Sequence, residues 1–239
     1  MDKIEKSIER LKAFEPSDGY YLAFSGGKDS ICIKQLTIEA GVKFDSHYQV
    51  TTIDPPELVH YIKREHPDVK WERPEIPFLT RLATKGFPIR QGRWCCEYYK
   101  ECGGGGRTVM TGIRWAESYT RKERKMVEHC FRDKTKRYVH PIIDWSKDDV
   151  WDFIHDRNLP YCSLYDEGYK RLGCLFCPMQ YYKTRMKEVR RYPGYEKAFR
   201  KAFRKLYTLR KEQGRKSVDR WKNGDEMFEW WITEGKGTL

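Results

Sequence analysis

The sequence predicts an α/β fold with a mostly parallel sheet and helices on both faces of that sheet. Apolar, β-rich runs recur along the chain, and segments with the apolar spacing of helices separate them; the runs are Gly19–Phe24, His47–Ile53, Thr108–Gly112 and Tyr138–Ile143. Strands that alternate with helices favour a parallel sheet. The 239 residues suffice for one sizeable core with a small appendage.

The chain opens with a predicted amphipathic helix. Its apolar residues share one helical face, and they are Ile4, Ile8, Leu11 and Phe14. Because the rest of this segment is charged, it does not resemble a secretory signal. No apolar run approaches the length of a membrane span, and the mean hydropathy is −0.85. We therefore expect a soluble, cytoplasmic protein with no membrane partner.

A Gly-rich turn follows the first predicted strand, with the sequence Ser25-Gly26-Gly27-Lys28-Asp29-Ser30. A strand that leads through such a turn into a helix presents backbone N–H groups and the positive end of the helix dipole to an anion. The glycines allow a tight turn, the lysine adds charge, and the serines supply hydroxyl donors. We interpret the turn as a phosphate-binding loop rather than an ordinary strand-to-helix connection. It lacks the spacing of the Gly-x-x-x-x-Gly-Lys-Ser/Thr loop, which disfavours a kinase-type site.

Other polar and glycine residues follow the next predicted strands. Asp54 comes after the second strand, and Gly112 through Ser118 come after the third. Since parallel sheets bind ligands at the carboxyl ends of their strands, we expect these residues and the Gly-rich turn to converge on one crevice. Further along, Ser146 and Asp149 form a capping-box pattern that predicts the start of a helix.

Two cysteine pairs predict a metal or redox centre. The chain has eight cysteines; Cys95 and Cys96 are adjacent, and Cys174 and Cys177 form a Cys-x-x-Cys turn. Four thiolates can hold zinc or an iron–sulfur cluster. Adjacent cysteines are awkward ligands for one zinc ion but can reach two irons of a [4Fe–4S] cluster, so we favour the cluster and keep zinc as the alternative. Cys102 is a reserve ligand, while the isolated cysteines are expected to be core or surface thiols, namely Cys32, Cys130 and Cys162.

Positive charge is concentrated towards the C-terminus. Of a formal net charge of +12, residues 181–239 carry +9, from 17 Lys+Arg and 8 Asp+Glu. This part also has an apolar helical stripe (Tyr195, Phe199, Ala202, Phe203, Leu206), an opposite basic face (Lys197, Arg200, Lys201, Arg204, Lys205) and an aromatic cluster (Trp221, Phe228, Trp230, Trp231). The basic face is either the solvated side of a docked helix or a nucleic-acid-binding patch. The aromatic cluster either anchors the tail to the core, which we favour, or offers stacking surfaces.

The change of character after Pro178 predicts two domains. Residues 1–178 would form a nucleotide-binding domain that includes the cysteine site, and residues 179–239 would form a basic, aromatic-rich helical extension. An excess of positive charge favours an anionic partner, and its location points to the extension as the region that meets nucleic acid.

Taken together, these motifs resemble the phosphoadenosine phosphosulfate (PAPS) reductase family of the PP-loop ATP pyrophosphatase superfamily. The resemblance rests on SGGKDS, on Cys95-Cys96, on residues 112–118 and on the run HPIIDWSKDDVWDFIHDRNLPYCSLYDEGYKRLGCLFCP. It implies a PP-loop (adenine nucleotide alpha-hydrolase-like) fold over residues 19–178. In that family a paired cysteine and a later Cys-x-x-Cys hold a [4Fe–4S] cluster beside the nucleotide; here Cys96 and Cys174 are 78 residues apart.

The resemblance also assigns roles to individual residues. Residues 25–30, with Lys28 as a catalytic group, would bind the phosphates of an adenine nucleotide, either ATP or the sulfonucleotides PAPS and adenosine 5′-phosphosulfate (APS). Arg114, the second catalytic group, and Ser118 would face the phosphate or sulfate end of the ligand, with Gly112 in the same site. Asp54 would contact ribose or Mg²⁺, although it is equally well placed to cap the turn that it begins.

Three functions are compatible with the resemblance. Sulfonucleotide reductases attack sulfur with a cysteine in a C-terminal segment, whereas this sequence has no cysteine after Cys177. We therefore predict an ATP-dependent enzyme that adenylates a nucleic-acid substrate and then inserts sulfur from a sulfur donor. The alternative is a PAPS or APS reductase that produces sulfite with electrons from a thioredoxin-like reductant. A second alternative is a non-catalytic nucleotide or nucleic-acid binding module with structural zinc.

Overall fold

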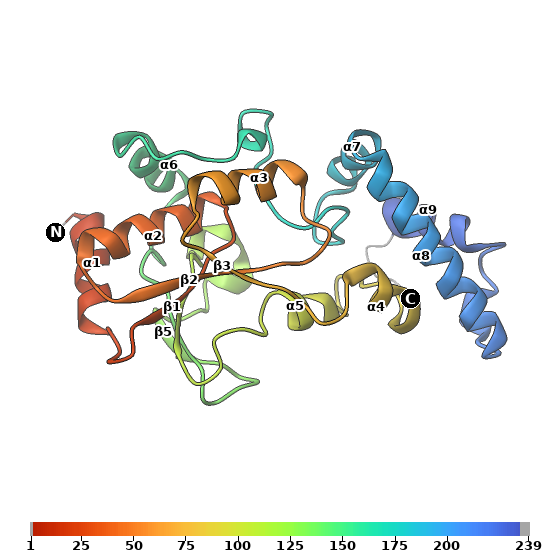
Figure 1. The fold of residues 1–239 in the computed structure, drawn as a ribbon, viewed down its shortest axis with the longest axis horizontal. Coiled ribbons are helices and arrows are strands. Elements are labelled where there is room, and N and C mark those ends of the chain that lie inside the picture. Colours follow the sequence, from red (N-terminus) through yellow and green to blue (C-terminus); the bar gives the residue numbers. More distant parts are fainter. Residues whose placement is uncertain (1, 235–239) are drawn as a thin grey trace. The chain divides into compact units, whose positions relative to one another are not determined.

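The computed structural model describes residues 2–234 of the chain (Figure 1). The chain divides into two compact units, which we call unit 1 and unit 2. Unit 1 consists of Met1–Gln49, Pro56–Glu72 and Cys102–Leu172, and unit 2 consists of Val50–Pro55, Arg73–Glu101 and Gly173–Leu239. Between residues 2 and 234, no helix is both long enough and apolar enough to cross a membrane.

Unit 1 is built on a six-stranded sheet with the order β3-β2-β1-β4-β6-β5. The strands are β1 (Tyr20–Ala23), β2 (Phe44–Gln49), β3 (Lys70–Glu72), β4 (Thr108–Met110), β5 (Val127–His129) and β6 (Arg137–Val139). Neighbouring strands are parallel except for β5 and β6, which are antiparallel. The predicted α/β fold with a mostly parallel sheet is confirmed.

The strand bounds differ from the predicted runs where polar residues or turns intervene. β1 matches its prediction, and its residues Tyr20 to Leu22 are buried. β2 begins earlier than predicted because its polar residues are paired, with Asp45 accepting hydrogen bonds from His47 and Lys70. It ends at Gln49, since the following segment turns, with Thr52 at a φ of +66°. β3 and β5 were not predicted, because three mostly polar residues give no apolar pattern.

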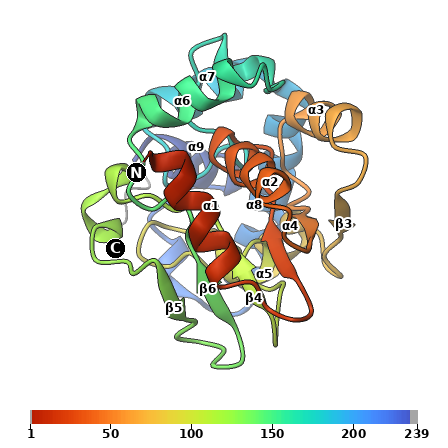
Figure 2. The same cartoon turned by 90° about the vertical axis from the view of Figure 1, so that its left-hand side faces the viewer.

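The helices of unit 1 are α1 (Lys3–Ala13), α2 (Lys28–Ala40), α3 (Pro56–Glu65) and α6 (Lys147–Asp156), with short 3₁₀ helices η1 (Trp115–Glu117), η2 (Tyr119–Arg121) and η3 (Ser163–Tyr165). The predicted N-terminal helix is α1, which lies alongside α2 (Figure 2). α6 starts as predicted, because the Asp149 N–H donates to Ser146 Oγ at 3.0 Å and the Ser146 N–H donates to Asp149 Oδ2 at 2.5 Å.

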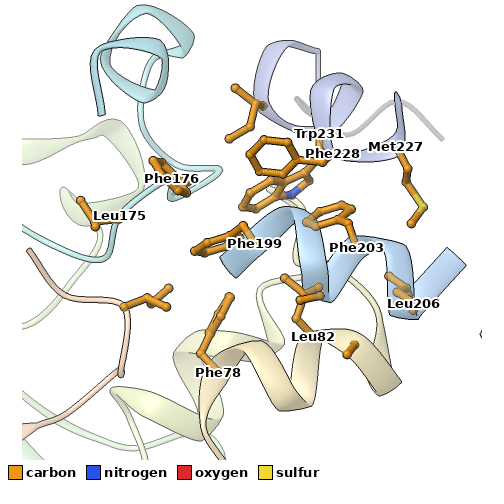
Figure 3. Packing of buried hydrophobic residues seen from close by; sticks show 14 of the residues in the cluster. Phe78, Leu82, Leu175, Phe176, Phe199, Phe203, Leu206, Met227, Phe228 and Trp231 are labelled. Carbon is orange, nitrogen blue, oxygen red and sulfur yellow. The ribbon is translucent and has the colours of Figure 1, made fainter. Parts of the chain in front are cut away.

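Unit 2 is helical, with α4 (Phe78–Lys85), α5 (Trp94–Tyr99), α7 (Tyr182–Arg191), α8 (Pro193–Glu212), η4 (Lys216–Val218) and α9 (Gly224–Thr233). Its core forms where α8 packs against α4 and α9. Figure 3 shows Phe199 and Phe203 of α8 facing Phe228 and Trp231 of α9 on one side and Phe78 of α4 on the other. The Phe199 and Trp231 rings stack with their centroids 5.8 Å apart. The aromatic side chains of α9 are buried in this core, which confirms the expectation that the aromatic cluster anchors the C-terminal helices.

The division into units does not coincide with the boundary expected after residue 178. Both cysteine pairs belong to unit 2, together with the C-terminal helices. The physical reason is apolar packing, since Leu175 and Phe176 of the Cys-x-x-Cys turn are buried in the same cluster as α8 and α9. Asp54 also belongs to unit 2, whereas the Gly-rich turn and residues 112–118 belong to unit 1.

Candidate functional site

The Gly-rich turn lies between β1 and the N-terminus of α2. Gly26 has a φ of +69°, and a Cβ at this position would lie 2.7 Å from Leu58 Cδ1 and 2.8 Å from Ile62 Cδ1 of α3. Position 26 therefore favours glycine for both backbone conformation and packing. Gly27 is the N-cap with a φ of −82°, and an added Cβ there would have no contact closer than 3.4 Å. The two glycines thus have different physical roles.

The two serine hydroxyls hold the turn in shape. Ser30 Oγ donates to the Gly27 carbonyl at 2.7 Å and accepts from the Ser25 N–H at 3.2 Å. Ser25 Oγ donates to Ser30 Oγ at 3.2 Å. These bonds organise the backbone at the start of α2, where helix N–H groups point towards an incoming anion.

Asp29 joins two cations beside the turn. Its Oδ2 accepts from Lys28 Nζ at 3.0 Å, and its Oδ1 accepts from Arg114 Nε at 2.6 Å. Arg114 is only 3% exposed and also donates from Nη1 to the Trp145 carbonyl at 3.3 Å. A buried guanidinium held this way is a fixed, directional donor for phosphate or sulfate oxygens. The structure therefore brings Arg114, from the segment of residues 112–118, to Lys28 and Asp29 of the Gly-rich turn.

Gly112 allows the chain after β4 to approach the start of α2. A Cβ on Gly112 would lie 2.8 Å from Asp29 Cβ and 3.0 Å from the Asp29 carbonyl carbon. Arg114 follows two residues later, so this close approach delivers its side chain to Asp29. Ser118 is exposed, and its hydroxyl lies 3.2 Å from Thr120 Oγ1. Among residues 112–118, Gly112 and Arg114 are therefore placed by the structure beside the turn.

Two residues that the sequence analysis missed belong to the same site. The Tyr165 hydroxyl, in η3, accepts the backbone N–H of Lys28 at 2.9 Å across 137 residues of sequence. Arg121 interacts electrostatically with Asp29 and Arg114, while burial and the nearby charge of Arg171 lower its pKa to about 10. Short sequence patterns do not indicate such long-range contacts, which form only when the chain folds.

Asp54 acts as a turn residue in unit 2. It is 6% exposed, and its Oδ2 accepts the backbone N–H of Thr51 at 2.9 Å. This hydrogen bond gives the Asp54 side chain a turn-capping role, and its contact with ribose or Mg²⁺ stays a prediction. The Asp54 carbonyl also accepts from the Tyr195 hydroxyl at 3.2 Å, so the turn is tied to α8.

The predicted cysteine pairs line one cavity in unit 2. Cys95 and Cys96 reach it from α5, and Cys174 and Cys177 reach it from the segment before α7. The hydrogen bond between the first two thiols raises the pKa of Cys95 and lowers that of Cys96. Burial raises the pKa of Cys174 to about 11, and the interaction with Cys174 raises the pKa of Lys100, which lines the same cavity.

A buried carboxyl holds the Cys-x-x-Cys turn. Phe176, between the two cysteines, is fully buried with a φ of +58°, which is uncommon for a bulky residue. Its N–H donates to Glu188 Oε2 at 2.7 Å, and Gln180 Nε2 donates to Glu188 Oε1 at 2.8 Å. Burial raises the pKa of Glu188 to about 7. These contacts fix the backbone from which both thiols project.

The donor set has the right chemistry for a thiolate-bound centre, since four sulfurs line one cavity. In the arrangement observed, however, no three Cys, His, Asp or Glu side chains within residues 2–234 stand close enough together to hold one metal ion. Cys102, the expected reserve ligand, lies in unit 1, where its Sγ donates to Gln49 Oε1 at 3.2 Å. Cys32 and Cys162 are buried and Cys130 is partly buried, in keeping with core or surface thiols.

Known proteins are similar to this chain in sequence. APS reductase of Oceanobacillus iheyensis is 30% identical over 162 residues, which span 64% of this chain and 65% of that protein. APS reductase of Staphylococcus epidermidis is 29% identical over 61% of this chain and 63% of its own length. The chain thus matches somewhat less than two thirds of the length of these relatives.

Solved structures show the same fold at low sequence identity. PAPS reductase from Candida auris, in a phosphate complex, has a TM-score of 0.53 at 17% identity, over 73% of this chain and 88% of that one. Candida glabrata FMN adenylyltransferase, with FAD and pyrophosphate, has a TM-score of 0.53 at 14% identity, over 72% and 64% of the two chains. The model of the phosphoadenosine phosphosulfate reductase domain matches residues 19–180, about two thirds of the sequence, and the chain therefore belongs to the phosphoadenosine phosphosulfate reductase family.

Proposed function

We propose that this chain is a sulfonucleotide reductase that binds APS or PAPS at the Gly-rich turn and releases sulfite. The observation that carries the proposal is the pair of cations, Lys28 and Arg114, held by Asp29 at the N-terminus of α2. Membership of the family and the relatives named APS reductase support a sulfonucleotide as the ligand. This ranking reverses the expectation from sequence, which placed ATP-dependent sulfur transfer first.

The bound phosphosulfate would meet three kinds of donor in unit 1. The N–H groups at the start of α2 would bind the α-phosphate, together with Lys28. Arg114 would balance charge on the phosphate as it becomes the leaving group, because its guanidinium is already oriented by Asp29 and the Trp145 carbonyl. Catalysis would thus rest on donors that are fixed before the ligand arrives.

The proposed reaction transfers the sulfonate group to a thiol. A cysteine thiolate attacks the sulfate sulfur, an S–S bond forms and the S–O bond to the phosphate breaks. The nucleotide leaves with the bonding electron pair, as AMP from APS or as adenosine 3′,5′-bisphosphate from PAPS. A dithiol reductant of the thioredoxin-like class then attacks the cysteine sulfur of the S-sulfocysteine. Sulfite leaves with that electron pair, the cysteine returns to its reduced form, and the dithiol becomes a disulfide.

Identifying the attacking thiol is part of the test. Cys102 is the exposed cysteine of unit 1, although partial desolvation of its sulfur raises its pKa. Anaerobic incubation with ³⁵S-labelled APS or PAPS should trap label on a cysteine, and added dithiol should release it as sulfite. Cys102→Ser should abolish trapping if this thiol attacks, with Cys130→Ser as the matched control. Absence of both trapped label and sulfite in the wild type would refute the reductase proposal.

We also propose that Cys95, Cys96, Cys174 and Cys177 hold a [4Fe–4S] cluster, with zinc as the alternative. A cluster of this kind, when bound, would supply a redox-active centre. Anaerobic purification with iron, sulfide and zinc measured should give about four irons per chain and a broad visible absorption. Cys174→Ser should lose this iron while Cys130→Ser retains it. Stoichiometric zinc without iron would favour the structural alternative.

One observation keeps ATP-dependent adenylation as the second candidate. The sequence has no cysteine between residues 178 and 239, so the segment after the cysteine cavity offers no thiol to attack sulfur. In this reaction Mg²⁺-bound ATP would transfer AMP to a nucleic-acid oxygen and release pyrophosphate, and a sulfur donor would then displace AMP. Pyrophosphate release that requires nucleic acid, with no sulfite formed from APS or PAPS, would establish this reaction in place of reduction.

A further inference from the structure

Two arginines of unit 1 have no role in the proposed reaction, although they interact with residues of the candidate anion site: Arg121 and Arg171. Arg121 belongs to η2, and Arg171 follows η3 in the chain. Both are in the same compact unit as the Gly-rich turn and Arg114. Their contacts tie them to the groups that would bind the first phosphate of a nucleotide.

Glu117 joins Arg121 to the segment that carries Arg114. Arg121 Nη1 forms an ion pair with Glu117 Oε2, and the same carboxylate oxygen accepts the Arg114 N–H at 3.1 Å. The Arg114 side chain in turn binds Asp29 at 2.6 Å. A continuous series of contacts therefore runs from the Gly-rich turn through Arg114 to Arg121, whose side chain is 30% exposed and so stays accessible to a ligand.

Arg171 is connected to the turn through Tyr165. The Tyr165 hydroxyl accepts the backbone N–H of Lys28 at 2.9 Å, so this ring borders the start of α2. The charge of Arg171 acts both on Tyr165 and on Arg121. Since Arg171 is exposed, a ligand that enters the site from solvent can contact it.

The two arginines repel each other. Burial and the like charge of Arg171 lower the pKa of Arg121 to about 10, although the Asp29 carboxylate acts in the opposite direction. Asp29 and Glu117 each accept hydrogen bonds or ion pairs from two groups already, so they compensate this repulsion only in part. Like charges that a fold holds together favour the binding of an anion between them.

A phosphate monoester has the chemistry that suits such a pair. It carries about −1.5 to −2 charges near pH 7 and three oxygens that accept hydrogen bonds. Guanidinium groups bind these oxygens in pairs and with fixed direction. In the proposed reaction, Lys28, Arg114 and the N-terminus of α2 serve the phosphosulfate. PAPS differs from APS by one phosphate monoester on the ribose 3′ oxygen, which is the group that further arginines would bind.

We propose that Arg121 and Arg171 form a second phosphate subsite, which binds the 3′-phosphate of PAPS and makes the chain selective for PAPS over APS. The inference rests on the proposed function for the identity of the ligand, but it concerns binding and requires no turnover. It differs from what the names of the similar proteins suggest, because those of Oceanobacillus iheyensis and Staphylococcus epidermidis are APS reductases.

The experiment is anaerobic titration calorimetry of the full chain with AMP, ADP and adenosine 3′,5′-bisphosphate. The last two carry the same number of phosphates, but ADP has its second phosphate where APS has its sulfate. The test variant is Arg121→Gln/Arg171→Gln. The matched control is Arg64→Gln/Arg157→Gln, which removes two guanidinium groups from exposed positions of the same unit.

The wild type should bind adenosine 3′,5′-bisphosphate at least about tenfold more tightly than AMP, because the added phosphate gains charge-assisted hydrogen bonds. The test variant should lower this preference to less than about threefold, whereas the control should keep it. The affinity for ADP relative to AMP should change by less than about threefold in the test variant, since ADP has no phosphate on its ribose 3′ oxygen.

A single substitution keeps the test decisive if the double variant does not fold. Arg171→Gln changes an exposed residue and leaves the ion pair between Arg121 and Glu117 in place. It should reduce the preference for the bisphosphate over AMP at least about threefold. An unchanged preference in this folded variant would contradict the role of Arg171.

Other outcomes would overturn the inference as a whole. Equal affinity of the wild type for AMP and the bisphosphate would reject the subsite and leave the proposed reduction of APS standing. A loss of ADP affinity as large as the loss of bisphosphate affinity would place the arginines at the sulfate end instead. Equal losses in the test and control variants would indicate attraction by net charge. If the wild type binds none of the three nucleotides, the proposed nucleotide site fails together with the inference.

Discussion

Arg114 Nε donates to Asp29 Oδ1 at 2.6 Å, which joins the chain after β4 to the first turn of α2 across 85 residues of sequence. The pair is close because Gly112 lacks a side chain where the two segments approach. Asp29 holds Lys28 with its other oxygen, so one carboxylate positions both cations of the candidate anion site.

Arg114→Lys should weaken sulfonucleotide binding about tenfold or more, although it keeps the charge. A lysine ammonium cannot reproduce the planar donor set that reaches both Asp29 and the Trp145 carbonyl. Isothermal titration with APS measures the effect. Arg107→Lys is the matched control. Arg107 precedes β4, whereas Arg114 follows it, and Arg107 pairs with Asp45 of β2. Equal losses in both variants would indicate that Arg114 acts only through general charge or stability.

Gly26→Ala should be far more harmful than Gly27→Ala. At position 26 a methyl group would collide with Leu58 and Ile62 and would force a left-handed backbone on alanine. At position 27 the backbone is extended and the space is sufficient. Urea unfolding should show a loss of about 1–3 kcal/mol for the first variant and less than about 1 kcal/mol for the second. The reverse order would contradict the described loop geometry.

Tyr165→Phe should tighten phosphate binding modestly. The tyrosine hydroxyl accepts the Lys28 N–H in the ligand-free chain, so an incoming phosphate oxygen must compete for that donor. Removal of a hydrogen bond worth about 1 kcal/mol should raise affinity for inorganic phosphate or APS up to about fivefold. Titration calorimetry on both proteins measures this change. Weaker binding in the variant would mean that the hydroxyl itself donates to the ligand.

His140 should make the protein less stable as the pH falls. It is fully buried beside Thr111 and Glu128, and burial lowers its pKa to about 4. Between pH 6.5 and pH 4 the unfolded chain therefore binds more protons than the folded chain, and the free energy of unfolding falls as the pH falls. His140→Gln should reduce the loss between pH 7 and pH 4.5 by about 2 kcal/mol in urea unfolding.

The residual pH dependence of that variant has a second source. Burial also lowers the pKa of His66 to about 4, where it contacts Lys34 and Tyr61, so part of the slope should remain. His60→Gln serves as the control, because His60 lies on an exposed part of α3. If the pH dependence of the unfolding free energy is unchanged in His140→Gln, the pKa of the buried imidazole does not differ between the folded and unfolded chain.

Much of unit 1 could be predicted because local chemistry specifies it. The run before Ser25, the Gly-rich turn and the capping pair at Ser146 each have a physical signature over a few residues, and β1 and α6 follow from them. Arg114 was identified through the family resemblance, in a segment that follows a predicted strand. Tyr165 was not, because its contact with Lys28 depends on how η3 returns to α2, which no short pattern encodes.

The division into units was harder to predict because it depends on apolar packing between distant segments. Leu175 and Phe176 of the Cys-x-x-Cys turn pack into the core of α8 and α9, a contact that no short sequence pattern encodes. Likewise, the sequence showed a basic face on α8 but could not show that Arg200 and Arg204 are paired with acidic residues of α9. Ion pairing between helices appears only in the folded chain.

The most direct test of the central claim is the binding of APS, PAPS and Mg²⁺-ATP to the wild type and to Lys28→Ala by titration calorimetry under anaerobic conditions. The account predicts that APS or PAPS binds at least about tenfold more tightly than ATP, and that Lys28→Ala loses most of that affinity. Tighter binding of ATP than of either sulfonucleotide, or sulfonucleotide binding that is unchanged in Lys28→Ala, would contradict it.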